Sequence, residues 1–312
     1  MADDPLSDDI PSHALDAAQG LWVRGLNDGG DSVHHRPLRS GSMGGAVART
    51  GILGVPMAPT AMVTGASSGI GREIAKCLAA KGHDVILVAR REELLRELAE
   101  SLISEHGCKA DVVVADLADP RQVSMVKEMV TDVDVLVNTA GYGKWGLLTD
   151  QEEGSIDGMV DVNVRALTGL SRHYGDRMVA KGSGRILNVA SIAAFQPGPG
   201  MAVYCATKSY VLSFSRAMHS EMRGTGVTVT CLCPGYVDTG FQEVAGMSLR
   251  GVESWSVIPA ERVARIGVKA MERGRREVIP GFLNKPIPLV GRMVPVWMQL
   301  AVVKALLMAG RD

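Results

Sequence analysis

The sequence of 312 residues has no excess of charge of either sign, no paired cysteines and no long apolar run. Its 33 basic and 34 acidic residues nearly cancel, so no overall field attracts nucleic acid or an anionic membrane, and a charged ligand must be held by local groups. No nucleic-acid partner is therefore predicted. No stretch approaches the roughly 20 uninterrupted apolar residues that a membrane-spanning helix needs, so no transmembrane segment is predicted either.

The five cysteines are dispersed and form no CxxC pair. Such usage is typical of reduced thiols in a reducing compartment, and it predicts no metal site. The acidic start, MADDPLSDDIPSH, lacks the basic and apolar segments of a secretion signal. We therefore expect a cytoplasmic protein.

Residues 1–55 are rich in Gly, Asp, Ser and Arg and show no sustained apolar period, so this extension is predicted to be disordered. His34 and His35 could ligate a metal, but no further ligand lies nearby, and a solvated pair is the favoured interpretation. Met57 precedes the first predicted strand and is an alternative start of the chain.

Residues 56–280 alternate short runs of β-branched residues with amphipathic stretches. This alternation predicts one α/β domain, a doubly wound (Rossmann) parallel sheet with helices on both faces. The expected strands are TAMVTG, DVILVAR, ADVVVADL, DVLVNTAG, GRILNVAS and VTVTCLCPG.

The apolar C-terminal tail, residues 281–312, is interrupted by Lys, Arg and Pro. Helices that pack on or near a substrate cleft are the favoured interpretation. An interfacial membrane helix and a dimer contact are the alternatives.

The segment TGASSGIG, from Thr64 to Gly71, follows the first predicted strand and opens a helix. In that context a glycine pattern predicts a dinucleotide site, because a helix N-terminus offers unpaired N–H groups and partial positive charge to a pyrophosphate. Gly65, Gly69 and Gly71 would allow a tight turn, close approach of the phosphates and close packing of helix on strand. A simple glycine-rich turn is the alternative.

The end of the second predicted strand indicates which cofactor binds. An acidic residue there would bind a free ribose hydroxyl, whereas arginine suits a 2′-phosphate. The sequence has Ala89, Arg90 and Arg91. NADP(H) is therefore favoured over NAD(H), with Arg90 as the main contact, although both arginines could merely begin a solvated helix.

A candidate acid and its neighbour lie in the segment YCATK. Tyr204 and Lys208 are four residues apart on a predicted helix and so share one face. A nearby ammonium would stabilise the phenolate and lower the tyrosine pKa. Ser191 ends a predicted parallel strand, at the edge where such sheets bind ligands, so a substrate carbonyl oxygen could accept hydrogen bonds from Ser191 and Tyr204.

The joint pattern of TGASSGIG, NTAG at 138–141, DVNVRAL, Ser191, YCATK and PGYVDT resembles the short-chain dehydrogenase/reductase family in its compact, single-domain form. The similarity covers roughly Thr60 to Thr239, and the tail resembles a branch of uncharacterised bacterial oxidoreductases. One departure is Thr139, where the family often has a second asparagine. A hydroxyl replaces only some amide hydrogen bonds, so strand support or cofactor affinity could differ.

The resemblance implies a catalytic set and a cofactor site. Tyr204 would exchange a proton with the carbonyl oxygen, Ser191 would polarise that oxygen, Lys208 would tune the tyrosine and bind ribose, and Asn163 would position a water. The implied cofactor contacts are Gly65, Ser67, Gly69, Ile70, Gly71, Arg90, Asp116, Leu117, Asn138, Ala140, Gly141, Tyr204, Lys208, Pro234, Gly235, Val237 and Thr239.

The expected function is NADP(H)-dependent reduction of a ketone, aldehyde or 3-oxoacyl group to an alcohol, or the reverse. Few charges near the expected substrate site favour an apolar small molecule; the residues concerned are Phe195, Met201, Phe241, Met247 and Trp255. The alternatives are a non-catalytic NADP-binding regulatory protein and an NAD-dependent alcohol dehydrogenase. A sugar-nucleotide epimerase is disfavoured because its TGxxGxxG pattern is missing. Resemblance also implies a homo-oligomer, paired through helices near residues 155–180 and 203–224.

Overall fold

The computed structural model describes residues 58–241, 245, 246 and 257–308. The extension at residues 1–55, with its histidine pair, and the alternative start at Met57 lie outside them. So do Met247 and Trp255.

A parallel sheet of seven strands forms the centre of the described chain, in the order β3-β2-β1-β4-β5-β6-β9. The predicted doubly wound fold is therefore confirmed. The strands are β1 (Thr60–Thr64), β2 (Asp84–Ala89), β3 (Ala110–Val114), β4 (Val135–Asn138), β5 (Gly184–Val189), β6 (Val227–Leu232) and β9 (Glu277–Val278). A separate short pair joins β7 (Val237–Asp238) to β8 (Ile258–Pro259).

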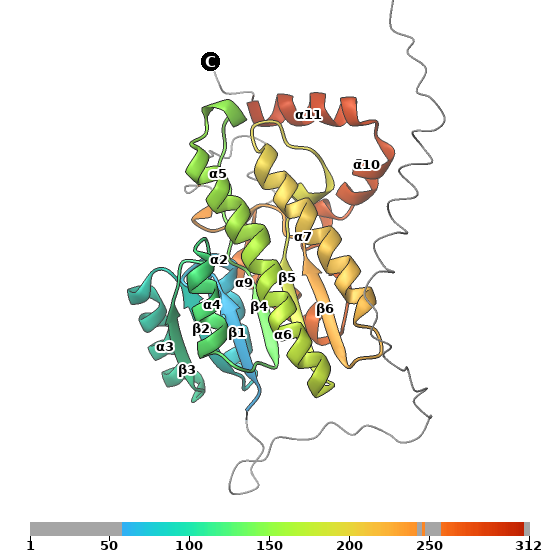
Figure 1. Cartoon of the computed structure of the whole chain (residues 1–312). Helices are drawn as coiled ribbons and strands as arrows, with labels where there is room; N and C mark the ends of the chain where they lie inside the picture. Colours follow the sequence, from blue (N-terminus) through green and yellow to red (C-terminus); the bar gives the residue numbers. More distant parts are fainter. Residues whose placement is uncertain (1–57, 242–244, 247–256, 309–312) are drawn as a thin grey trace, which may run out of the picture. The chain divides into compact units, whose positions relative to one another are not determined.

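Both faces of this sheet are buried under helices. Alternate residues of each strand point to opposite faces, so each strand from β1 to β6 contributes to two apolar clusters. On β1, for example, Ala61 and Val63 belong to the apolar cluster on one face, whereas Met62 belongs to the cluster on the other. The first face is covered by α2 (Gly69–Ala79), α3 (Glu92–His106) and α9 (Ala260–Glu272), and the second by α4 (Pro120–Met129), α6 (Leu167–Lys181) and α7 (Ala202–Glu221). In Figure 1, α6 and α7 cross in front of the sheet.

The order in which successive strands are added to the sheet reverses between β1 and β4, which are parallel neighbours. Open α/β sheets bind ligands outside the carboxyl ends of their strands at such a point. The glycine loop follows β1, and the segment 139–141 follows β4. The topology thus brings both predicted cofactor segments to one crevice.

Helix α4 and strand β9 are among the elements that were not predicted from the sequence. Helix α4 begins at Pro120 behind the capping residue Asp119, whose side chain accepts a hydrogen bond from the Arg121 N–H. Proline at the first helical position after such a cap is a recognisable start signal. Strand β9 has two residues, too few for a periodic pattern to show.

The C-terminal residues form α10 (Ile287–Met293) and α11 (Val296–Met308), which Figure 1 draws in red at the top of the view. Within the described residues, no helix combines the length and apolar content needed to cross a bilayer.

Candidate active site

The glycine loop is built for close backbone approach. Gly65 has a φ of 67°, in the left-handed region, and a Cβ there would lie 2.9 Å from the backbone of Ala140. A Cβ on Gly71 would collide with the carbonyl oxygen of Gly65. Only glycine fits at both positions, so the first turn of α2 lies directly against β1, and the N–H groups of that turn border the cavity described below. This cradle fits a pyrophosphate.

Thr64 joins the ends of β1 and β4. Its Oγ1 accepts hydrogen bonds from the N–H groups of Thr139 (3.0 Å) and Ala140 (3.1 Å) and donates to the carbonyl of Val137 (3.3 Å). The Thr139 hydroxyl is itself buried without a hydrogen-bond partner among the described residues. The support that an amide could give at this position comes instead from Thr64, which the sequence reasoning did not single out.

The two arginines after β2 lie differently from expectation. Arg90, the expected main contact, is 70% exposed in its side chain and lies 3.8 Å from the carboxylate of Asp116. Arg91 donates hydrogen bonds to Ser67 Oγ (2.9 Å from Nη2) and Ser68 Oγ (2.6 Å) in the glycine loop. Both arginines line the cavity, so two cationic side chains are available to a ribose phosphate bound there.

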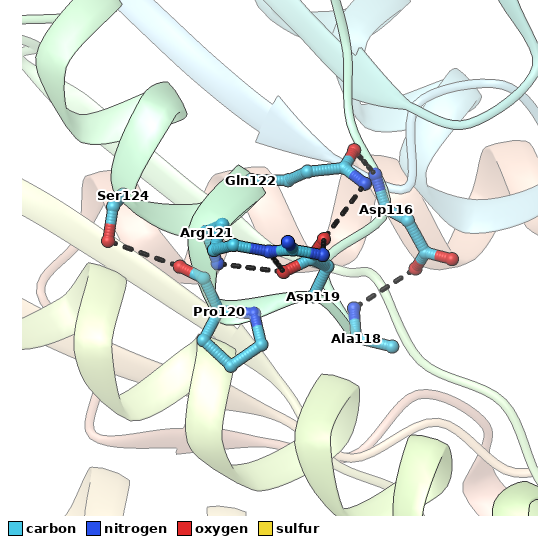
Figure 2. A network of polar contacts seen from close by, with 7 residues as sticks. All are labelled: Asp116, Ala118, Asp119, Pro120, Arg121, Gln122 and Ser124. Carbon is cyan, nitrogen blue, oxygen red and sulfur yellow. Dashed lines mark hydrogen bonds and ion pairs between the residues drawn. The ribbon is translucent and has the colours of Figure 1, made fainter.

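Asp116 is held by the capping network at the start of α4, which Figure 2 shows. Its N–H donates to Gln122 Oε1 (2.8 Å), and its carboxylate accepts from the Ala118 N–H (3.0 Å). Asp119 in turn caps α4 through the Arg121 N–H (2.9 Å). The unpredicted helix α4 therefore fixes the position of Asp116, one of the implied cofactor contacts.

Ser191, Tyr204 and Lys208 come together at the carboxyl end of β5. Ser191 begins the 3-10 turn Ile192–Phe195 (η4), and its hydroxyl hydrogen-bonds with Tyr204. The Lys208 ammonium lies 5.8 Å from the centre of the Tyr204 ring and donates to the carbonyl oxygen of Val189 (2.9 Å). All three side chains are at least nine-tenths buried, so their hydrogen bonds act in a medium of low polarity.

Burial shifts the pKa values of Tyr204 and Lys208, and the sequence did not predict the direction of either shift. Desolvation raises the pKa of Tyr204, and the hydrogen bond from Ser191 offsets this only in part. Desolvation also lowers the pKa of Lys208 to about 8. The expected lowering of the tyrosine pKa by the lysine is therefore not found: desolvation of the buried phenolate is the largest cause of the shift, and Lys208 is not among the groups that change this pKa.

Asn163 lies in a turn of π-helix, Asp161–Ala166 (η3), between α5 (Glu153–Val160) and α6. Such turns are rare and are often found at functional sites. The Asn163 side chain donates to the carbonyl of Tyr142 (2.9 Å) and to Thr207 Oγ1 (3.0 Å), and it accepts from the Tyr142 N–H (3.1 Å). Its amide thus holds the backbone beside the cavity and does not line it.

A cavity of about 1450 Å³ joins these groups. Two predicted site residues, Asn138 and Asn163, do not line it. The Asn138 amide instead donates to Ser171 (3.0 Å) and Asn188 (2.8 Å), which are both buried. The predicted residues that do line the cavity are Gly65, Ser67, Gly69, Ile70, Gly71, Arg90, Asp116, Leu117, Ala140, Gly141, Ser191, Tyr204, Lys208, Pro234, Gly235, Val237 and Thr239.

The other end of the cavity has an apolar wall. Met201 and Phe241, both predicted near the substrate, line it, whereas Phe195 packs in a separate cluster with Val211. The tail also contributes to the wall, through Leu283, Asn284, Ile287 and Val303. A nucleotide cradle, a buried hydroxyl pair with an amine, and an apolar end therefore share one space.

This fold and site define a nicotinamide-dependent oxidoreductase. A family model described as short chain dehydrogenase matches residues 59–248. The chain belongs to that family and is an NAD(P)-dependent oxidoreductase that interconverts carbonyl compounds and alcohols.

Individual relatives agree with this assignment. An uncharacterised oxidoreductase of Staphylococcus epidermidis is 36% identical over 187 residues, which cover 59% of this chain and 80% of the relative. A solved short-chain dehydrogenase from Sphingobium yanoikuyae in complex with NADPH is 30% identical, with 81% of this chain and 96% of that chain covered and a TM-score of 0.69. A bulky-bulky ketone specific alcohol dehydrogenase from Comamonas testosteroni is 29% identical, with 76% and 95% covered and a TM-score of 0.65.

Proposed function

We propose that this enzyme uses NADP(H) to reduce an apolar ketone or aldehyde, or to oxidise the corresponding alcohol. The observation that carries the proposal is the convergence of Ser191, Tyr204 and Lys208 at one cavity, between a nucleotide cradle with two arginines and an apolar wall. The solved relative with NADPH and the one specific for bulky ketones support the cofactor and the substrate class.

The side chains have separable roles in this proposal. When bound, the reduced nicotinamide supplies a hydride to the carbonyl carbon. Tyr204 donates its proton to the carbonyl oxygen, and Ser191 hydrogen-bonds to the same oxygen and stabilises the charge that develops on it. The raised pKa of Tyr204 keeps the phenol protonated at neutral pH, which suits a donor in the direction of reduction. Lys208, whose ammonium lies 5.8 Å from the centre of the Tyr204 ring, places a positive charge beside the reacting groups while it is protonated, and Asn163 positions the neighbouring backbone.

The arginines explain the preference for NADP(H). Both line the cavity, and Arg91 is already oriented by Ser67 and Ser68. Removing one of them should weaken NADPH binding about 10- to 100-fold, as expected for loss of hydrogen bonds to a charged group, and should leave NADH binding nearly unchanged.

The test is a fluorescence titration of the purified chain with NADPH and NADH. It compares the wild type with Arg90→Ala and Arg91→Ala, and uses Arg96→Ala on the outer side of α3 as the matched control. Equal affinity for the two nucleotides would favour the NAD-dependent alternative, and no binding of either would reject the proposal. A panel of apolar ketones, aromatic aldehydes and 3-oxoacyl thioesters then follows, with Tyr204→Phe as the inactive variant that still binds NADPH.

A further inference from the structure

The tail helices expose an unusual amount of apolar surface. More than half of the exposed large apolar side chains in the described part of the chain lie between Phe282 and Val302. Met293 is 73% exposed and Trp297 70%. Helix α11 is apolar on nearly all sides, VWMQLAVVKALLM, whereas a helix on the surface of a water-soluble domain normally turns polar residues outward. A concentration of exposed apolar side chains in one segment marks an interaction site.

This surface is a fixed part of the domain. Asn284 is buried, and its amide donates to the carbonyl of Pro280 (2.9 Å). Gln299 is buried between the two helices and donates to the carbonyls of Gly291 (2.9 Å) and Val294 (2.6 Å). Val303 packs inward and lines the cavity. The inner side of the tail is therefore anchored, and the apolar residues on its outer side are held outward together.

The charge of the tail favours one kind of partner. Between Gly281 and Met308 the sequence contains Lys285, Arg292 and Lys304 and neither Asp nor Glu. All three cations are exposed. The whole chain has a net charge of −1, so this segment differs sharply from the rest. Apolar side chains accompanied only by cations, with a tryptophan among them, match the interface of an anionic bilayer. A second copy of the same tail would instead bring like charges together.

The same surface reaches the mouth of the cavity. Leu283 lines the cavity and is 70% exposed, so it lies at the rim. Its neighbour Phe282 is 82% exposed, and the Lys285 ammonium lies 5.9 Å from the centre of the Phe282 ring. An apolar molecule that left a bilayer in contact with this rim would enter the apolar end of the cavity without crossing water.

We infer that α10 and α11, with the turn Phe282–Asn284 (η6), bind the surface of an anionic lipid bilayer and place the cavity mouth against it. The apolar side chains enter the boundary between headgroups and acyl chains, and the three cations contact lipid phosphates. A corollary, which rests on the proposed function, is that the carbonyl or alcohol substrate is lipophilic and is taken from the membrane.

The test is sedimentation of the full chain with vesicles of phosphatidylglycerol and phosphatidylcholine, and with vesicles of phosphatidylcholine alone, in the absence of substrate. The wild type should sediment with the anionic vesicles, and less so as salt increases. The double variant Arg292→Gln/Lys304→Gln should weaken this binding about fivefold for each cation removed. Lys109→Gln/Arg223→Gln, which removes the same charge elsewhere, should leave it unchanged.

The apolar contribution is tested with Met293→Ser/Trp297→Ser, which should abolish sedimentation. The control is Met129→Ser, at a methionine on α4 that is 62% exposed, and it should have no effect. Absence of sedimentation with either vesicle, or equal loss in tail and control variants, would overturn the inference. Light scattering without lipid that showed an oligomer dissociated by the tail variant would assign the surface to a second copy, and would overturn it as well. NADPH titration of every variant reports folding and tests the proposed function separately.

Discussion

The buried amine of Lys208 should lower the stability of the fold at neutral pH. Its pKa falls from 10.5 to about 8, which corresponds to about 3 kcal/mol spent on keeping the amine charged in the folded chain. In Lys208→Met a side chain of similar length removes this cost. It also removes the hydrogen bond to Val189, worth about 1 kcal/mol. The net gain is about 2 kcal/mol, or a rise in melting temperature of about 5 °C for a chain of this size.

The gain should depend on pH in a defined direction. Below pH 8 the lysine is charged in both the folded and the unfolded chain, so the full cost is present. Between pH 8 and about 10.5 the unfolded chain keeps a proton that the folded chain has released, so the free energy of unfolding of the wild type rises with pH. The difference in free energy of unfolding between Lys208→Met and the wild type should therefore become smaller from pH 7 to pH 10.

Thermal unfolding followed by circular dichroism at pH 7 and pH 10 measures this difference. Lys109→Met, at an exposed lysine, is the matched control and should show no such narrowing. A variant that melted below the wild type at pH 7, or a difference that stayed constant with pH, would refute the reasoning. The same variant should have lost its enzymatic activity, so stability and function would be seen to oppose each other at one side chain.

Three further predictions concern the site. Gly65→Ala should lower the melting temperature by several degrees and weaken NADPH binding, because φ is 67° and a Cβ would meet backbone at 2.9 Å. Gly82→Ala, at a φ of 83° with open space around it, should cost only about 1 kcal/mol of stability. Equal losses of stability in the two variants would count against the cradle. Asn163→Ala should cost about 3 kcal/mol in chemical denaturation and lower kcat, because it leaves the Tyr142 backbone unpaired; unchanged denaturation would contradict this. Initial rates of reduction should fall as pH rises through about 8, where Lys208 loses its charge, and a flat profile to pH 9.5 would remove the lysine from the mechanism.

The sheet could be predicted from the sequence because strands that are buried on both faces consist almost entirely of apolar, often β-branched residues. The segments DVILVAR and GRILNVAS are short, apolar and rich in β-branched residues, and they became β2 and β5. Helix α4 was missed although its Asp-Pro start is recognisable. The π turn at Asn163 leaves no such trace, because its composition is that of ordinary helix.

The sequence predicts which residues lie at the strand ends around the site. It does not predict the direction in which each of their side chains points. Arg90 and Arg91 are adjacent, and only their positions in space show that Arg91 reaches the glycine loop. Asn138 ends β4, but its amide donates to Asn188 on the neighbouring strand and the residue does not line the cavity. The pKa directions of Tyr204 and Lys208 depend on burial, which the YCATK motif does not encode.

The π turn makes the length of one helix as important as its composition. Each N–H in such a turn bonds to the carbonyl five residues back, so the turn contains one residue more than an α-helix would need. Deleting Val164 would let the segment close as regular helix with α5 and α6 still in phase. If the same residues instead adopted regular α-helical bonding without a deletion, the extra residue would rotate α5 by about 100° relative to α6. Met159, which packs in one cluster with Tyr204, would then face elsewhere, although every residue that lines the cavity remained in the sequence.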